Sequence, residues 1–192
     1  MTQPVLGIDP GTAVTGYGVV APANGRPGRL IECGVIRTSP RQPLGIRLAA
    51  LYEGMQELLQ RHAPSAVAVE GVFYAKNVRT TVALGQARGV ILLAATQAGV
   101  HVQEFAPAAV KKAVAAGGRG TKSQVAYMVQ QLLRLTRPPT PSDAADGVAH
   151  VFVGGRGDGA SVEDDKVRGG AIPGGIEAFG GKQRFQSGAI RL

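Results

Sequence analysis

The spacing of apolar residues divides the first part of the chain into short strands and one-sided helices. Three stretches rich in Val and Ile, residues 4–9, 14–21 and 29–38, are separated by turns of Gly and Pro, which is typical of an antiparallel meander. Two further short apolar runs, residues 66–70 and 100–105, predict strands that extend this sheet. A mixed five-stranded sheet is therefore expected.

Between these strands the apolar spacing changes to three and four residues, the period of a helix that is packed on one side. This pattern begins after Pro43, and the Ala63-Pro64 step ends that helix. Further helices are expected at residues 79–98, 107–115 and 122–135, and a last one begins near Ser142. The alternation predicts an α/β domain in which helices flank the sheet.

The helix expected at residues 79–98 is apolar on nearly all sides and carries Gly85 and Gly89 four positions apart. Small residues at this spacing permit close helix packing. Two interpretations stay open: the helix is buried on the sheet, or one of its faces also forms a subunit interface.

After Val153 the composition changes to Gly-rich sequence with scattered charges and little apolar periodicity. This composition predicts one folded domain over residues 1–153, followed by a flexible tail over residues 154–192.

The charge balance favours a polyanionic partner, because 21 Lys and Arg residues against 13 Asp and Glu residues give a net charge of +8. The sequence contains no apolar run of membrane-spanning length and no signal-peptide pattern at its start, so a cytoplasmic protein without membrane contact is expected. Cys33 is the only cysteine, which excludes an internal disulfide and a zinc site built on cysteine pairs.

Four carboxylates stand at positions where the predicted elements can bring them together. Asp9 and Glu70 each end an apolar strand, and Asp143 and Asp146 lie three positions apart at the start of the last helix, on one face. Hard cations prefer oxygen ligands, and two-metal phosphodiester hydrolysis needs several carboxylates at one point. We therefore expect these side chains to form a magnesium site.

The four acids differ in how strongly the sequence alone supports a functional role. Glu70 follows a run of Ala and Val, where an unpaired buried carboxylate would be costly. Asp143 could equally be an ordinary acid at a helix start. His150 lies four residues after Asp146 and is expected to support the metal site from outside its ligand set.

Aromatic and basic residues follow Glu70 directly, in a combination suited to stacking on unpaired bases while contacting phosphate. They are Phe73, Tyr74, Lys76 and Arg79. The two aromatic residues could instead anchor the loop in the core. A second basic segment, residues 117–123, is Gly-rich and leads into a helix, so Arg119 and Lys122 are either DNA contacts or part of a solvated loop.

Taken together and in order, these motifs resemble those of RuvC-type Holliday-junction resolvases. The matching segments are 6–11 (LGIDPG) with 15–18 (TGYG), 70–73 (EGVF) with 75–77 (AKN), 84–89 (LGQARG), 122–125 (KSQV) and 143–146 (DAAD). The resemblance implies a ribonuclease H-like nuclease domain and a homodimer. It also implies two Mg²⁺ ions per active site, with Mn²⁺ able to replace them, and symmetric nicking of four-way DNA junctions in recombination and repair, alongside RuvA and RuvB.

The resemblance also implies roles for individual residues. Asp9, Glu70, Asp143 and Asp146 match the acidic metal-binding set, although some members of the family carry His at the position of Asp143. Lys111 and Lys122 match basic positions associated with DNA binding and catalysis, and Phe73 matches an aromatic residue proposed to stack on a base near the crossover.

Two other functions are compatible with parts of the sequence. The turn at residues 7–12 (GIDPGT) also resembles the phosphate loop of actin-like sugar kinases and ATPases, but those folds need two such domains and this chain has room for one. A junction-binding module without enzymatic activity would explain the positive charge, but not the converging acids, which repel DNA phosphates in the absence of metal.

Overall fold

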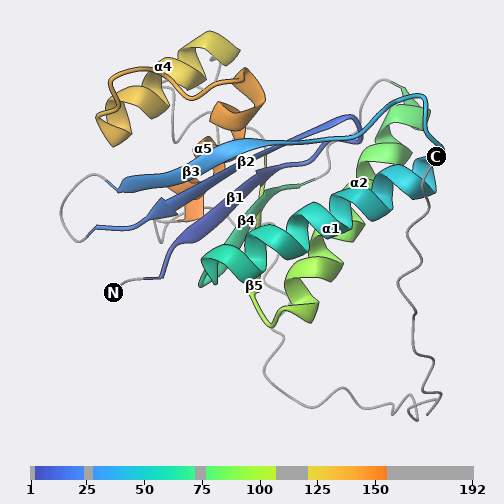
Figure 1. Ribbon diagram of the computed structural model, residues 1–192. Coiled ribbons are helices and arrows are strands. Elements are labelled where there is room, and N and C mark those ends of the chain that lie inside the picture. Colours follow the sequence, from blue (N-terminus) through green and yellow to red (C-terminus); the bar gives the residue numbers. More distant parts are fainter. Residues whose placement is uncertain (1–2, 24–27, 72–76, 107–120, 155–192) are drawn as a thin grey trace, which may run out of the picture. The chain divides into compact units, whose positions relative to one another are not determined.

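A computed structural model of the protein describes residues 3–23, 28–71, 77–106 and 121–154 (Figure 1). The strands are β1 (Val5–Asp9), β2 (Val14–Ala21), β3 (Arg29–Arg37), β4 (Ala66–Glu70) and β5 (His101–Phe105). The helices are α1 (Leu44–His62), α2 (Val78–Gln97), α4 (Lys122–Leu133) and α5 (Ser142–Gly154). The sequence patterns predict all of these elements, and their bounds are confirmed to within about two residues.

Two expectations from the sequence lie outside the described residues. They are the short helix at residues 107–115 and nearly all of the tail at residues 154–192. Of the helices that the structure does describe, none is long and apolar enough to cross a membrane.

The strands form one mixed sheet in the order β3-β2-β1-β4-β5. The first three strands are antiparallel neighbours, whereas β4 runs parallel to β1 and β5 parallel to β4. The predicted five-stranded mixed sheet is confirmed. Because Ile8 of β1 pairs with Val69 of β4, the last residues of these two strands, Asp9 and Glu70, lie side by side at the same edge of the sheet.

Helices cover both faces of the sheet, with α1 and α2 on one face and α4 and α5 on the other (Figure 1). Side chains alternate between the faces along each strand. Leu6 and Ile8 of β1 are fully buried against α1 and α2, whereas Gly7 between them faces α5. In β4, Val67 and Val69 face the first helix pair, and Ala68 faces the second. The middle residues of β1 and β4 are therefore buried, whereas the strand-end residues Asp9 and Glu70 are partly exposed.

The glycines of β2 and α5 allow the start of α5 to lie directly on the sheet. A Cβ atom on Gly147 would lie 2.6 Å from the Cα of Tyr17, and one on Gly16 would lie 1.9 Å from the carbonyl oxygen of Asp143. Neither distance is possible for real atoms, so both positions require Gly. This contact brings the first turns of α5 to the end of β1.

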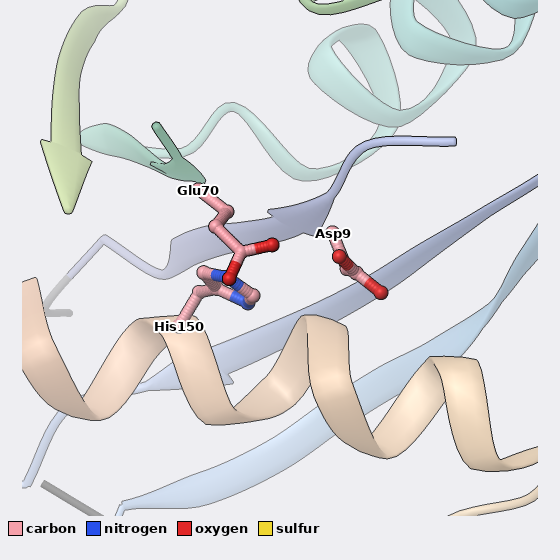
Figure 2. Close-up of side chains that lie close together, drawn as sticks. All are labelled: Asp9, Glu70 and His150. Carbon is pink, nitrogen blue, oxygen red and sulfur yellow. The ribbon is translucent and has the colours of Figure 1, made fainter. Parts of the chain in front are cut away.

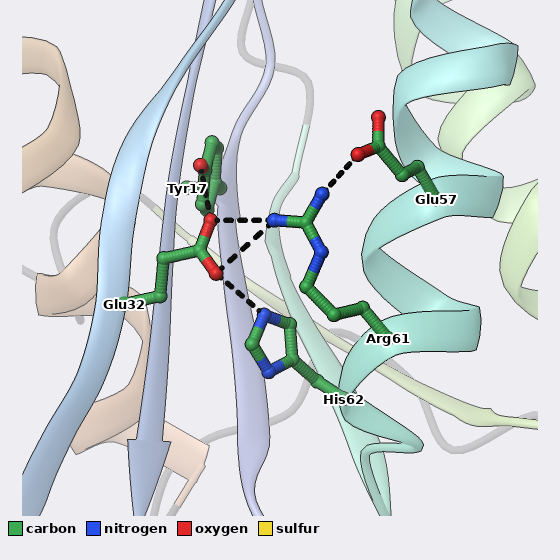
Figure 3. Close-up of polar contacts among 5 residues, drawn as sticks. All are labelled: Tyr17, Glu32, Glu57, Arg61 and His62. Atoms are coloured by element: carbon green, nitrogen blue, oxygen red, sulfur yellow. Dashed lines mark hydrogen bonds and ion pairs between the residues drawn. The ribbon is translucent and has the colours of Figure 1, made fainter.

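A polar network joins the meander to α1 on the face away from α5 (Figure 3). Glu32 of β3 accepts hydrogen bonds from the hydroxyl of Tyr17 at 2.8 Å and from Arg61 at 3.1 Å, and its other oxygen lies 2.8 Å from Nε2 of His62. Arg61 also pairs with Glu57 within α1. Burial alone would raise the pKa of Glu32, but these hydrogen bonds lower it overall.

Candidate active site

Asp9 is the last residue of β1, and a turn follows it directly. The side chain of Thr15 is buried and ties down this turn, because its hydroxyl donates a hydrogen bond to the carbonyl oxygen of Gly11 at 2.6 Å. The backbone N–H of Thr38 donates to the carbonyl oxygen of Ala13 at 3.0 Å. These hydrogen bonds fix the turn that follows Asp9, and this turn fixes the position of the Asp9 carboxylate at the sheet edge.

Glu70 ends β4, and the N–H of Gly71 continues the pairing with β5 by donating to the carbonyl oxygen of Phe105 at 2.8 Å. The Glu70 carboxylate points toward α5 and lies beside the ring of His150, with Asp9 on the neighbouring strand (Figure 2). Asp143 and Asp146 come from the first turns of α5, three residues apart as the sequence predicts.

Ligand atoms of these residues form two groups that share Asp9. In one group, atoms of Asp9, Asp143 and Asp146 all lie within 4.8 Å of one another, and in the other the same holds for Asp9, Glu70 and His150. The four predicted acids are therefore brought together, with Asp9 at the centre and the other ligands on either side.

The carboxylates strongly affect each other's charge state. Burial, together with the nearby carboxylates of Glu70 and Asp146, raises the pKa of Asp9 to about 7, while Lys122 acts in the opposite direction. A partly buried carboxylate beside other carboxylates is stabilised by taking up a proton or by binding a cation. The cluster carries up to four negative charges beside one ammonium group, so it is suited to binding divalent cations.

Lys122 lies among the acids. Its Nζ atom is 3.0 Å from Oδ1 of Asp143 and 3.2 Å from Oδ2 of Asp146, and the hydrogen bond to Asp143 raises its pKa. Lys122 is the first residue of α4, whose start is fixed by a capping box between Thr121 and Gln124. The sequence marks Lys122 as a DNA contact but contains no signal for its pairing with the acids, because α4 and α5 meet only through tertiary packing.

Five of the other predicted DNA contacts lie outside the described residues. They are Phe73, Tyr74, Lys76, Lys111 and Arg119. Arg79 is described: it is exposed in the first turn of α2, where its backbone N–H donates to the side chain of the N-cap residue Asn77 at 2.9 Å.

His150 lies deeper in the site than the sequence suggests. Its side chain is 2% exposed, and Nδ1 lies 2.7 Å from the backbone carbonyl oxygen of Asp146, one turn earlier in α5. Burial lowers its pKa to about 4, so the ring is neutral. The spacing of four residues after Asp146 places it on the correct helix face, but only the fold brings it within ligand distance of Asp9 and Glu70.

A mixed sheet between two helix layers, with carboxylates converging at the ends of two neighbouring strands, defines a ribonuclease H-like protein with a candidate divalent-metal centre. A family model described as Crossover junction endodeoxyribonuclease RuvC matches residues 5–153. The chain belongs to the RuvC family, and the resemblance predicted from its motifs is confirmed.

Individual relatives agree with this assignment. Crossover junction endodeoxyribonuclease RuvC of Pelotomaculum thermopropionicum is 51% identical over 145 residues, which are 76% of this chain and 88% of that protein. The protein of the same name from Halorhodospira halophila is 48% identical over 145 residues, or 76% of this chain and 85% of that protein. The solved structure of Thermus thermophilus RuvC in complex with Holliday junction substrate superposes with a TM-score of 0.73 and 39% identity, covering 78% of this chain and 91% of that chain. The ribonuclease H-like fold expected from the sequence is thereby confirmed.

Proposed function

We propose that this protein is a structure-selective endonuclease that resolves four-way DNA junctions by symmetric, Mg²⁺-dependent nicking in recombination and repair. The observation that carries the proposal is the position of Asp9, which belongs to both groups of potential ligands. Family membership supports the same reaction, since the relatives named above are crossover junction endodeoxyribonucleases.

In this proposal Asp9 contributes to two metal positions. Asp143 and Asp146 complete one of them, and Glu70 contributes to the other. Two bound Mg²⁺ ions, which Mn²⁺ can replace, would activate a water and stabilise the departing 3' oxygen, so that 5'-phosphate and 3'-hydroxyl ends result. The anchored turn after Asp9 holds the shared carboxylate in place, and Lys122 offers a cation to the approaching phosphate.

The basic and aromatic residues predicted to contact DNA keep that role in the proposal. They are Phe73, Tyr74, Lys76, Arg79, Lys111, Arg119 and Lys122. Four-way junction DNA suits a chain with a net charge of +8. Because the acids would repel the backbone phosphates, productive binding depends on cations in the acidic cluster.

We infer further that the active form is a homodimer joined along α2. Val78, Val82 and Leu93 are 77%, 55% and 50% exposed. Gly85 and Gly89 complete the stripe, and apart from its immediate chain neighbours and the backbone of its own helix turn, a Cβ atom on either would meet no described atom within 4 Å. The spacing of these five positions follows one helix face. Two copies joined here would present two sites to a symmetric junction.

Three broader features complete the proposal. Residues 1–153 form the nuclease domain, in line with the extent of the family match. The family resemblance implies that the protein works with RuvA and RuvB. In this proposal the protein acts on DNA in the cytoplasm.

The proposal is tested by cleavage of a synthetic four-way junction in Mg²⁺. We expect the wild type to cut two opposed strands at symmetric positions, and Asp9→Asn to lose at least about a hundredfold in rate while still binding the junction. Glu53→Gln is the matched control, because Glu53 is an exposed acid on α1 and should have no effect. Cutting by Asp9→Asn at the wild-type rate would contradict the metal-site assignment.

The same assay separates the alternatives. Junction binding without cleavage in either Mg²⁺ or Mn²⁺ would favour a binding module. Saturable ATP binding, measured by calorimetry, would favour the kinase-like alternative.

A further inference from the structure

His150 has the properties of a metal ligand rather than those of a packing residue. Nδ1 lies 2.7 Å from a backbone carbonyl oxygen, which can only accept a hydrogen bond, so Nδ1 carries the ring proton. In the neutral ring, Nε2 is then left with a free lone pair. A histidine whose other nitrogen donates to a carbonyl is the usual form of a metal-binding histidine.

Nε2 is both buried and unpartnered. Among the described residues it has no hydrogen-bond partner, although the side chain is 2% exposed. A buried polar atom without a partner is costly, and native proteins rarely keep one without a reason. A Leu at this position would fill the space without that cost, so the unpaired nitrogen points to a ligand.

The neighbours of His150 show what that ligand is. Potential ligand atoms of His150, Asp9 and Glu70 lie within 4.8 Å of one another. Donor atoms bound at about 2.1 Å to one ion lie up to about 4.2 Å apart, so a small shift of the side chains would bring all three around a single cation. Figure 2 shows the Glu70 carboxylate directed toward the His150 ring.

We propose that His150 is the nitrogen ligand of a metal position that it completes with Asp9 and Glu70, and that this position prefers a first-row transition ion such as Mn²⁺ to Mg²⁺. The inference rests on the proposed metal-dependent function and refines it. Mg²⁺ strongly favours oxygen ligands, whereas imidazole suits transition ions. The position formed by Asp9, Asp143 and Asp146 has only oxygen donors and keeps its preference for Mg²⁺. The two halves of the centre therefore differ in the ion that they select.

The test is pulsed electron paramagnetic resonance of the full chain with Mn²⁺ at half the protein concentration. We expect electron spin echo modulation from a directly bound ¹⁴N nucleus, and its replacement by the ¹⁵N pattern when the histidines are isotopically labelled. His150→Leu should lose this modulation. It should also bind Mn²⁺ about tenfold more weakly, with an Mg²⁺ affinity within about twofold of wild type.

The chain offers a control that leaves the site intact. His62 and His101 are the other two histidines. In the double variant His62→Gln, His101→Gln, only His150 can supply the signal, so the modulation must persist even if His150→Leu fails to fold. Bound Mn²⁺ without nitrogen modulation in the wild type, modulation that survives in His150→Leu, or absence of Mn²⁺ binding would each overturn the inference. Junction cleavage in Mg²⁺ reports separately on the proposed function, so the two failures are distinguishable.

Discussion

The Nζ atom of Lys122 lies 3.0 Å from Oδ1 of Asp143. The ammonium group therefore neutralises part of the acidic cluster and stands close to where a divalent cation would bind. The side chain of Lys122 is 65% exposed, so it can move aside at little cost. In the proposed mechanism, Lys122 and a metal ion compete for Asp143 and Asp146, and the displaced lysine contacts a phosphate.

Replacing this lysine should separate metal binding from catalysis. Lys122→Met is expected to bind Mg²⁺ about three- to tenfold more tightly at pH 8.5 in the absence of DNA, because a competing and repelling cation is removed and solvent screens part of the effect. Junction cleavage at saturating Mg²⁺ should nevertheless fall, since a cation near the phosphate is lost. Isothermal calorimetry and a cleavage time course measure the two effects.

Arg29→Met is the matched control for this loss of charge. Arg29 is exposed and pairs with Ala21, at the end of β2 opposite to the site. It should leave Mg²⁺ affinity and cleavage unchanged. Equal or weaker Mg²⁺ binding by Lys122→Met would show that the lysine does not compete with the metal.

The raised pKa of Asp9 predicts how stability depends on pH when metal is absent. The pKa is about 7 in the folded protein, against 3.8 for the ordinary side chain. Between these values the unfolded chain has lost a proton that the folded protein keeps, so the free energy of unfolding decreases as pH rises from about 4 to about 7. Asp9→Asn removes this cost. In EDTA at pH 8 the variant should be more stable by about 1–3 kcal/mol, and the difference should shrink toward pH 4.

Urea unfolding at several pH values measures this difference, and Mg²⁺ should reverse its sign. The wild type gains stability from bound metal, whereas Asp9→Asn binds it poorly and gains little. Below about pH 7 metal binding also has to displace the Asp9 proton, so wild-type Mg²⁺ affinity should increase with pH in that range. A lower stability of Asp9→Asn than of wild type at pH 8 in EDTA would show that burial and the neighbouring carboxylates do not destabilise the ionised Asp9 side chain.

The contact between α5 and β2 predicts the effect of a single methyl group. A Cβ atom at position 147 would lie 2.6 Å from the backbone of Tyr17, so Gly147→Ala must push the helix away from the sheet. We expect a loss of about 1–3 kcal/mol in the free energy of unfolding and a more than tenfold decrease in cleavage, because Asp143 and Asp146 move with the helix. Thermal unfolding and the junction assay provide the measurements.

Gly45→Ala is the control for this substitution. Gly45 lies in α1, and apart from its immediate chain neighbours and the backbone of its own helix turn, an added Cβ atom would meet no described atom within 4 Å. Since Ala favours the helix, this variant should be stabilised by about 0.4–1 kcal/mol and cleave normally. Wild-type stability and activity in Gly147→Ala would mean that α5 tolerates displacement and that the close contact is unimportant.

The exposed stripe on α2 predicts a variant with altered assembly. Leu93→Glu places a charge on the apolar face and should raise the dimer dissociation constant at least about tenfold, as measured by sedimentation. Coordinated cutting of the two strands should fall with it. Ile46→Glu is the matched control, because Ile46 is 54% exposed on α1, outside the stripe. A Leu93→Glu protein that remains as dimeric as wild type would exclude α2 as the interface.

Most of the fold was predictable from local patterns. Alternating and three-to-four spacings of apolar residues reflect which side of each element is buried, and this information is contained in short segments. The strand ends at Asp9 and Glu70 and the start of the last helix near Ser142 were predicted in this way. The convergence of the four acids was predictable as well, because parallel neighbouring strands end at the same edge of the sheet.

The sequence by itself determined the elements, the acids and the family, since each depends on residues that are close in the chain or on motifs in a fixed order. Only the tertiary structure decided that Lys122 pairs with the acids of α5 and that His150 lies beside Asp9 and Glu70. Lys122 reaches the acids because α4 packs on α5, and His150 reaches Glu70 because Gly residues let α5 lie directly on the sheet. Such contacts join segments far apart in sequence, and their distances depend on the packing of whole helices, which no local pattern encodes.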